Sequence, residues 1–197
     1  SFPGFNPIVE LSLTHHTQVV GANGQRQAMF LENVSGLADR ILRNFDCSEK
    51  DSALVVSSSG CNVVSTEMAE EFQRRGVRVV ALVSKAHLSA SESKRDDGRK
   101  LDDFADLVLD TGAPAGDAMV TVDGFDLPVA PGSTVGGCLI VNAIKAEVAC
   151  LLTAAGKPPK ALTATCVIGK ERAEKIFEAA YDEHSRRLAR LYETLGK

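Results

Sequence analysis

The sequence predicts an α/β protein built on an open, mainly parallel sheet. Two short aliphatic runs, residues 53–56 and 77–84, each lead into a polar loop, and a third strand is predicted over residues 105–110. A helical pattern separates the first two strands, and this strand–helix–strand order is typical of parallel sheets with helices on their faces. We expect the first run to be a short buried strand. The second run is so uniformly aliphatic that both of its faces should be covered.

Hydrophobic spacing predicts the helices. Apolar residues three and four positions apart indicate amphipathic helices over residues 25–44 and 62–75, and Gly76 ends the second. In the second helix, we expect Glu67, Glu70 and Glu71 to point mostly outward. Its apolar residues should point inward: Val63, Val64, Met68, Ala69 and Phe72. Residues 134–155 predict the longest and most apolar helix, and residues 171–195 a charged amphipathic one.

Turn signals and composition predict the connections. Residues 85–100 form a polar connection that can hold a short helix but has no core face, and alternation around Asp123-Gly124 predicts a hairpin. We predict a single domain over residues 1–197. Its extended N-terminal segment would cover residues 1–24, and its linker and C-terminal helix residues 156–197.

Charge and hydropathy argue against several partners. The net charge is −4, so no basic surface suggests nucleic acid or an acidic membrane. We find no apolar run that approaches the roughly 20 residues of a membrane span, and no charged-then-apolar leader. The chain starts at Ser1 without an initiator methionine. We therefore expect a cytoplasmic protein with no membrane partner.

The cysteines do not suggest a metal site or disulfides. There are five of them, an odd number without a C-x-x-C pair, so we predict reduced thiols and no metal. Cys61 stands apart because a helix N-terminus would stabilise its thiolate. No histidine is close to it in sequence, which argues against a catalytic nucleophile.

Three polar segments follow the predicted strands, at residues 57–62, 84–89 and 110–117. In open parallel sheets, ligands bind beyond the carboxyl ends of the strands. These segments are far apart in sequence, but we expect them to meet at one edge of the sheet and to form a ligand site.

The stretch "LVVSSSGCNVVSTEMAEEF" places Ser57, Ser58, Ser59 and Gly60 where a strand passes into a helix. Unpaired N–H groups and the helix dipole stabilise an anion there, and glycine permits a sharp turn close to it. The sequence contains neither G-x-x-x-x-G-K-[ST] nor G-x-G-x-x-G. These features favour a compact phosphate monoester, without a nucleotide cofactor. The alternative is that Ser59 or Asn62 merely caps the helix.

These residues resemble the SIS (sugar isomerase) family of phosphosugar-binding domains, and most strongly its bacterial phosphoheptose-isomerase-like branch. The similarity covers "VVSSSGCNVVSTEMA", "VVALVSKAHLS", "ADLVLDTGAPAGDA", "VAPGSTVGGCLIVNAIKAEVA" and "DEHSRRLARLY", five segments in order between about Asn6 and Tyr192. The resemblance implies a three-layer α/β/α sandwich of flavodoxin-like, Rossmann type. It also implies a sugar-phosphate ligand, no cofactor, and a homodimer or homotetramer.

The resemblance also assigns site residues. Ser57, Ser59 and Gly60 would hold the phosphate, with Asn62 beside it and Ser84 at the end of the next strand. The chemistry of the loop adds the Ser58 hydroxyl to these phosphate-binding candidates. Ser133 and Thr134 would complete the cradle or contact the sugar, and Asp117 would accept hydrogen bonds from sugar hydroxyls. His184 would reach the site of a neighbouring subunit.

Two departures from the family pattern affect the function. The usual first strand and its Gly-x-Gly-x-Ser-like loop are not visible before Asn6, so we expect that strand to be missing from this chain. Enzymes of the family tend to place histidine on the last core helix, where this chain has Asn142.

Isomerisation would need a base to move a proton between adjacent carbons. The catalytic candidates are Glu67, His87 and His184, while Glu147 and the pair His15-His16 are weaker ones. Three hypotheses remain: a sugar-phosphate isomerase, a non-catalytic phosphosugar-sensing module, and an α/β scaffold whose serine loop only caps a helix. We favour phosphosugar binding over isomerase activity.

Overall fold

The computed structural model describes residues 24–43 and 45–192. The contacts divide the chain into two compact units, and the division falls within helix α6, between Ile140 and Val141. One unit holds described residues 24–140 and the other residues 141–192. The predictions for residues 1–23, including His15-His16 and the extended segment, lie outside the described residues.

A parallel three-stranded sheet organises the first unit. Strands β1 (Ser52–Val56), β2 (Arg78–Val83) and β3 (Leu107–Asp110) lie in the order β1-β2-β3. Their register aligns Val55 with Ala81 and Ala81 with Val108. The predicted α/β class, the parallel sheet and all three strands are confirmed.

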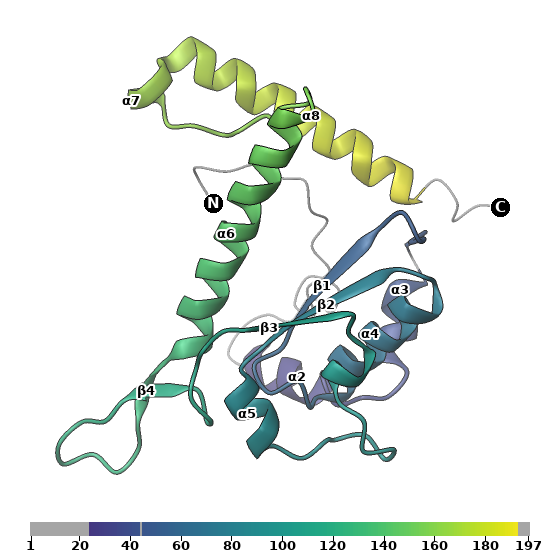
Figure 1. Ribbon diagram of the computed structural model, residues 1–197, viewed down its shortest axis with the longest axis vertical. Coiled ribbons are helices and arrows are strands. Elements are labelled where there is room, and N and C mark those ends of the chain that lie inside the picture. Colours follow the sequence, from purple (N-terminus) through teal and green to yellow (C-terminus); the bar gives the residue numbers. More distant parts are fainter. Residues whose placement is uncertain (1–23, 44, 193–197) are drawn as a thin grey trace. The chain divides into compact units, whose positions relative to one another are not determined.

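Helix α4 (Val63–Arg74) covers one face of this sheet together with the short 3-10 helix η1 (Leu101–Phe104). Figure 1 shows α3 and α4 together on one side of the strands. All five predicted inward residues of α4 are buried, and Gly76 ends the helix with φ 74°. Apolar burial of this kind stabilises the fold by about 25 cal/mol per Å². The predicted outward orientation of Glu71 is wrong, because Glu71 is buried.

The opposite face of the sheet is partly open. Alternate residues of a strand point to opposite faces, and Leu54, Val56 and Leu107 are exposed while Val79, Ala81 and Val83 are fully buried. The expectation that β1 is buried is therefore wrong for the side chains on this face. The second strand is better covered, with only Arg78 exposed and Val80 half-buried.

The helix predicted over residues 25–44 is two helices, α2 (Gly24–Leu31) and α3 (Leu37–Leu42). A turn separates them, in which the N–H of Val34 donates to the carbonyl of Leu31. Gly36 adopts φ 81° at the N-terminus of α3. A left-handed conformation cannot continue a helix, and this explains the break.

The connections after β2 follow the sequence with one exception. Residues 85–100 contain helix α5 (Lys85–Ala90), whose Leu88 is buried, so the expectation of no core face is wrong. The predicted hairpin is confirmed as the antiparallel pair β4 (Ala118–Val120) and β5 (Val129–Pro131), with Gly124 at φ 78° in its loop.

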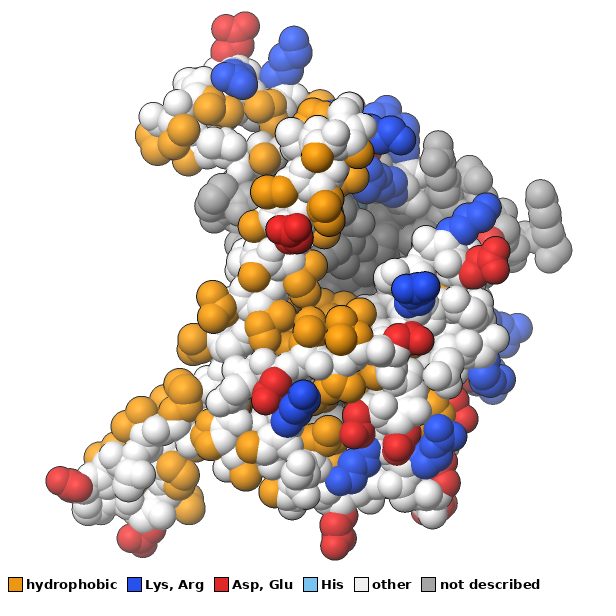
Figure 2. Space-filling model, viewed as in Figure 1, with side chains coloured by type: hydrophobic (Ala, Val, Ile, Leu, Met, Phe, Trp, Pro, Cys, Tyr) orange, Lys and Arg blue, Asp and Glu red, His pale blue; other side chains and the backbone are white. Residues whose placement is uncertain are grey.

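Helix α6 (Gly132–Ala154) is long and apolar. Its most apolar 18 residues have a mean hydropathy of 1.8, and none of them is buried. The expectation that no apolar run approaches the length of a membrane span is therefore wrong by length and composition. The core helix of a soluble protein passes the same test, so this helix is weak evidence for a membrane. Figure 2 shows hydrophobic side chains along α6 and on the β4–β5 hairpin.

The second unit continues beyond α6 with α7 (Thr165–Ile168), inside the predicted linker, and α8 (Lys170–Tyr192). Glu183 of α8 pairs with Lys160 of the linker and with Arg187 one turn further on. Leu162 is buried. These contacts attach the linker to the charged C-terminal helix.

Candidate functional site

The three polar segments at the carboxyl ends of the strands meet, as predicted. The N–H of Ser84 donates to the carbonyl of Ser58 at 2.9 Å, and the Ser84 hydroxyl donates to the carbonyl of Ala113 at 2.7 Å. The N–H of Lys85 donates to Asp110 Oδ1 at 3.0 Å. Ser84 is thus the central connection between the first and third segments.

Gly60 determines the shape of the serine loop, which we define as residues 57–62. The Gly60 N–H donates to Ser57 Oγ at 3.2 Å, and its backbone has φ 64°. A Cβ atom at this position would lie 2.8 Å from Leu88 Cδ1 and 3.4 Å from Leu101 Cβ. Only glycine combines this conformation with so close a packing distance, so the loop follows a tight path under α5 and η1.

The loop leads directly into the N-terminus of α4. Asn62 is the N-cap residue, with φ −73° and ψ 145°, and its side chain makes no capping hydrogen bond. Ser59 Oγ accepts from the N–H of Cys61 at 3.4 Å, and Cys61 lies before the helix. Neither predicted cap is therefore made by a side chain. The first N–H groups of a helix have no intrahelical acceptor and carry partial positive charge. The N–H of Val64 donates to the carbonyl of Glu32 at 2.9 Å, so an anion at this end of α4 would use the other N–H groups of the first turn.

His87 lies beside the serine loop on α5. Its Nδ1 atom is 3.3 Å from Ser58 Oγ, and its backbone N–H donates to Ser84 Oγ, the N-cap of α5, at 3.0 Å. The His87 imidazole is half-buried and lies in contact with a loop hydroxyl. His87 is the titratable catalytic candidate that the described structure brings to this loop.

Asp117 and Ser133 bind each other. The Asp117 carboxylate accepts from the N–H and the hydroxyl of Ser133, each at 2.7 Å, and its carbonyl accepts from the N–H of Gly132. Asp117 thereby caps the start of α6, in an unusual non-glycine conformation of φ 71°. Thr134, the next residue, is exposed. This pairing uses the carboxylate oxygens that were expected to face a sugar.

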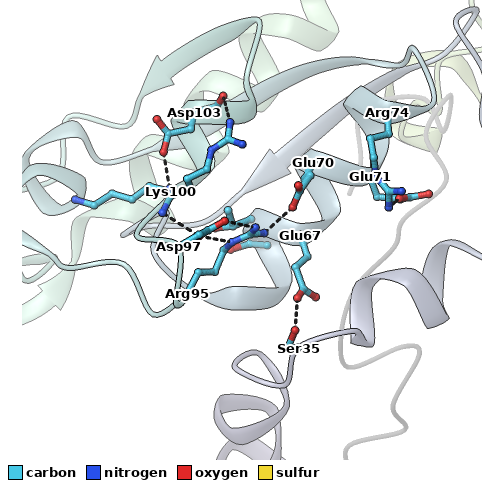
Figure 3. Close-up of polar contacts among 12 residues, drawn as sticks. Ser35, Glu67, Glu70, Glu71, Arg74, Arg95, Asp97, Lys100 and Asp103 are labelled. Atoms are coloured by element: carbon cyan, nitrogen blue, oxygen red, sulfur yellow. Dashed lines mark hydrogen bonds and ion pairs between the residues drawn. The ribbon is translucent and has the colours of Figure 1, made fainter.

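Glu67 binds the start of α3. Its carboxylate accepts from the Ser35 hydroxyl at 2.7 Å and from the Gly36 N–H at 2.9 Å. Figure 3 shows this contact and the neighbouring ion pair between Glu70 and Arg95. A depression of about 230 Å³ here is lined by Ser35, Gly36, Ala38, Asp39, Glu67, Glu70, Glu71 and Arg74, and by no residue of the serine loop. The structure gives Glu67 a structural partner, and catalysis by Glu67 stays an untested prediction.

Cys61 is buried within the loop, where its thiol donates to the carbonyl of Ser59 at 3.1 Å. Burial raises the pKa of the Cys61 thiol above its usual value, and the charges of Lys100 and Lys94 lower it by less. The raised pKa is opposite to the expected stabilisation of the thiolate, because loss of hydration on burial outweighs the effect of the neighbouring lysines.

His184 belongs to the second unit, on α8, and is half-buried. Asn142 and Glu147 are exposed on the part of α6 that belongs to the same unit. The serine loop belongs to the other compact unit, and a role for His184 at a neighbouring subunit's site stays a prediction.

Sequence reasoning missed the connection at residues 91–100. The N–H of Lys94 donates to the carbonyl of Cys61 at 3.0 Å, and the N–H of Leu101 donates to the carbonyl of Gly60 at 2.9 Å. The segment therefore packs directly against the serine loop. Its four basic residues, Lys94, Arg95, Arg99 and Lys100, were the available signal.

Comparison with known proteins identifies the family. The SIS domain family matches residues 1–84 of the chain. A UPF0309 protein of Thermoanaerobacter pseudethanolicus is 30% identical over 176 residues, which cover 88% of this chain and 69% of that relative. The chain belongs to the UPF0309 family of SIS-domain proteins. This confirms the resemblance inferred from the motifs, and the flanked parallel sheet is consistent with a three-layer sandwich.

Other UPF0309 proteins are similar over shorter stretches. The relative from Halalkalibacterium halodurans is 33% identical over 152 residues, and that from Brucella anthropi 37% identical over 142 residues. These matches cover 77% and 72% of this chain but only 63% and 57% of the two relatives. Membership of the SIS-domain families suggests binding of a sugar or a phosphorylated sugar.

Proposed function

We propose that this chain binds a phosphorylated sugar, with the phosphate held by the serine loop at the N-terminus of α4. The observation that carries the proposal is the start of α4, where the Asn62 side chain makes no capping hydrogen bond and three serines and Gly60 precede the helix. A tetrahedral oxyanion would accept hydrogen bonds from the N–H groups at the start of α4 other than that of Val64, and from the hydroxyls of Ser57, Ser58 and Ser59. The sugar would then lie toward His87.

A thermal-shift screen tests this proposal. The panel would pair hexose, heptose, pentose and amino-sugar phosphates with their unphosphorylated forms. A ligand that binds the folded state raises the melting temperature by mass action, so we expect stabilisation by the phosphorylated members alone. Ser59→Ala should abolish the shift, while Ser65→Ala, on the first turn of the same helix, should keep it. Equal shifts with both members of every pair would contradict the proposal.

The second candidate is a sugar-phosphate isomerase, favoured only by the contact between His87 and Ser58. An imidazole here could act as the base that isomerisation requires. Glu67, the other candidate in this unit, is occupied by Ser35 and Gly36. Turnover of the stabilising sugar phosphate, lost in His87→Ala while binding remains, would establish this activity. Binding without turnover would leave a phosphosugar-sensing module.

We also propose that the protein is a cytoplasmic homodimer or homotetramer. The exposed apolar surface of α6 supports association, since monomeric proteins rarely expose large contiguous apolar patches. A charged substitution on this surface should therefore weaken the association.

A further inference from the structure

The segment of residues 91–100 is a closed, ordered loop. The Ser93 hydroxyl donates to the carbonyl of Arg99 at 2.6 Å, and Gly98 has φ 72° in the turn between them. The hydrogen bonds from Lys94 and Leu101 attach both ends of this loop to adjacent carbonyls of the serine loop. The position of Lys94 is thus determined relative to Cys61, one residue before the α4 N-cap.

Three of the four basic side chains in this segment have structural partners. Arg95 pairs with Glu70 at 2.8 Å and with Asp97 at 2.6 Å. The Arg99 guanidinium lies 3.8 Å from the ring centre of Phe104. Lys100 Nζ donates to the carbonyls of Leu88 and Ser91 at 2.9 and 2.6 Å, beside the C-terminus of α5. All three therefore stabilise the loop or the elements beneath it.

Lys94 differs from these three. Its side chain is exposed and makes no hydrogen bond or ion pair to any described residue, although its backbone is bound to the serine loop. Its charge acts on Cys61, since it lowers the pKa of that thiol against the larger effect of burial. Residues 57–62 themselves contain no basic side chain. A phosphate monoester carries nearly two negative charges at neutral pH, more than one helix end balances.

We propose that Lys94 supplies the cationic contact to the phosphate at the serine loop and so selects a dianionic ligand. This inference rests on the proposed function, because it assigns a further residue to the same site. A lysine binds phosphate as a point charge through three N–H donors. The backbone of Lys94 is hydrogen-bonded to Cys61, which lies one residue before the α4 N-cap. This bond limits the positions that the ammonium group can reach.

Titration calorimetry with inorganic phosphate tests the inference. Lys94→Ala keeps the backbone N–H that binds Cys61, so the loop should stay folded, and circular dichroism checks this. We expect the dissociation constant to rise about tenfold, as for loss of one charged hydrogen bond. Lys94→Arg should bind within about threefold of the wild type, because the charge is retained. Lys50→Ala, an exposed lysine before β1 at the opposite edge of the sheet, should bind as the wild type does.

Salt provides a second readout. Raising the salt concentration should weaken phosphate binding to the wild type more than to Lys94→Ala, since the variant has lost a screened charge interaction. If Lys94→Ala binds like the wild type while Ser59→Ala does not bind, the inference about Lys94 is overturned and the phosphate site stands. If the wild type itself does not bind phosphate, the proposed function fails and the inference fails with it.

Discussion

At the scale of single residues, the serine loop depends on Gly60. The residue has a left-handed backbone, and a Cβ at this position would lie 2.8 Å from Leu88 Cδ1 and 3.4 Å from Leu101 Cβ and Val83 Cγ1. A side chain at position 60 would have to adopt the left-handed conformation and displace the end of the Leu88 side chain. The path of the loop, and hence the direction of its N–H groups, is therefore set by packing as well as by hydrogen bonding.

Gly60→Ala should lower both stability and phosphate binding. The left-handed conformation and the 2.8 Å approach to Leu88 together should cost about 2–4 kcal/mol of unfolding free energy, measured by urea denaturation. Gly124→Ala is the matched control, because Gly124 has φ 78° and no neighbouring atom within 4 Å. It should cost only about 1–2 kcal/mol. Equal losses in the two variants would show that packing at Gly60 is unimportant.

Asp97 should contribute stability at neutral pH that is lost in acid. Its hydrogen bond with Arg95 lowers the pKa of the Asp97 carboxyl to about 2, below the value of about 3.9 in unfolded chains. The folded state therefore binds fewer protons in this range, and the stabilisation is complete above about pH 4 and lost as pH falls through about 2.

Replacing Asp97 should flatten this acid dependence. In urea titrations, Asp97→Asn should differ most from the wild type above about pH 5 and approach it below about pH 3. Asp96→Asn is the control, since Asp96 makes no hydrogen bond or ion pair to other described residues. A difference from the wild type that stays constant with pH would refute the linkage.

At the scale of elements, one arginine joins two helices. Arg75, just after α4, donates to the carbonyls of Leu42 and Phe45 at 3.0 Å each, beside the end of α3. It also pairs with the buried Glu71 at 2.8 Å. This arrangement gives a second donor to the Leu42 carbonyl at the end of α3 and a donor to the Phe45 carbonyl, and it explains why Glu71 points inward.

Arg75→Ala should therefore destabilise the packing of α3 on α4. Two carbonyls and a buried carboxylate would lose a partner, so we expect a loss of about 2–4 kcal/mol of unfolding free energy. Arg74 pairs with the same Glu71, but its side chain is 69% exposed against 24% for Arg75. Arg74→Ala should cost at most about 1 kcal/mol. Guanidinium unfolding of both variants tests the contrast, and equal costs would contradict it.

At the scale of the whole molecule, α6 is the feature that the described contacts leave uncovered. Val135, Leu139 and Leu151 are each more than half exposed, along a helix whose only buried residue is Gly132. Single exposed apolar residues are normal, but a helix of this length with an apolar surface indicates contact with something else. We expect that contact to be a second copy of the chain, in line with the proposed homo-oligomer.

Light scattering tests this expectation. The wild type should be dimeric or tetrameric, and Leu139→Asp should shift it toward the monomer, because burying an unpaired carboxylate costs several kcal/mol. Val167→Asp, at an equally exposed position on α7, should leave the mass unchanged. A monomeric wild type, or one that floats with lipid vesicles, would contradict the expectation.

The sequence by itself determined the local features of this protein. Periodicity located the strands of the parallel sheet, α4 with its buried face, and the hairpin, because these depend on nearby residues. The serine loop and its place at the carboxyl edge of the sheet followed from the order of strands and helices. The family resemblance, carried by motifs in order, was confirmed by the comparisons.

Only the tertiary structure decided which polar groups are already used. Glu67, Ser84 and Asp117 bind partners 16–32 residues away in sequence, which no local pattern reveals. The break at Gly36 likewise interrupts an apolar spacing that continues through it. Lys94 became a candidate only because its backbone meets Cys61 across 33 residues of chain. Hydrogen bonds over such separations depend on the packing of whole elements, which hydrophobic spacing does not specify.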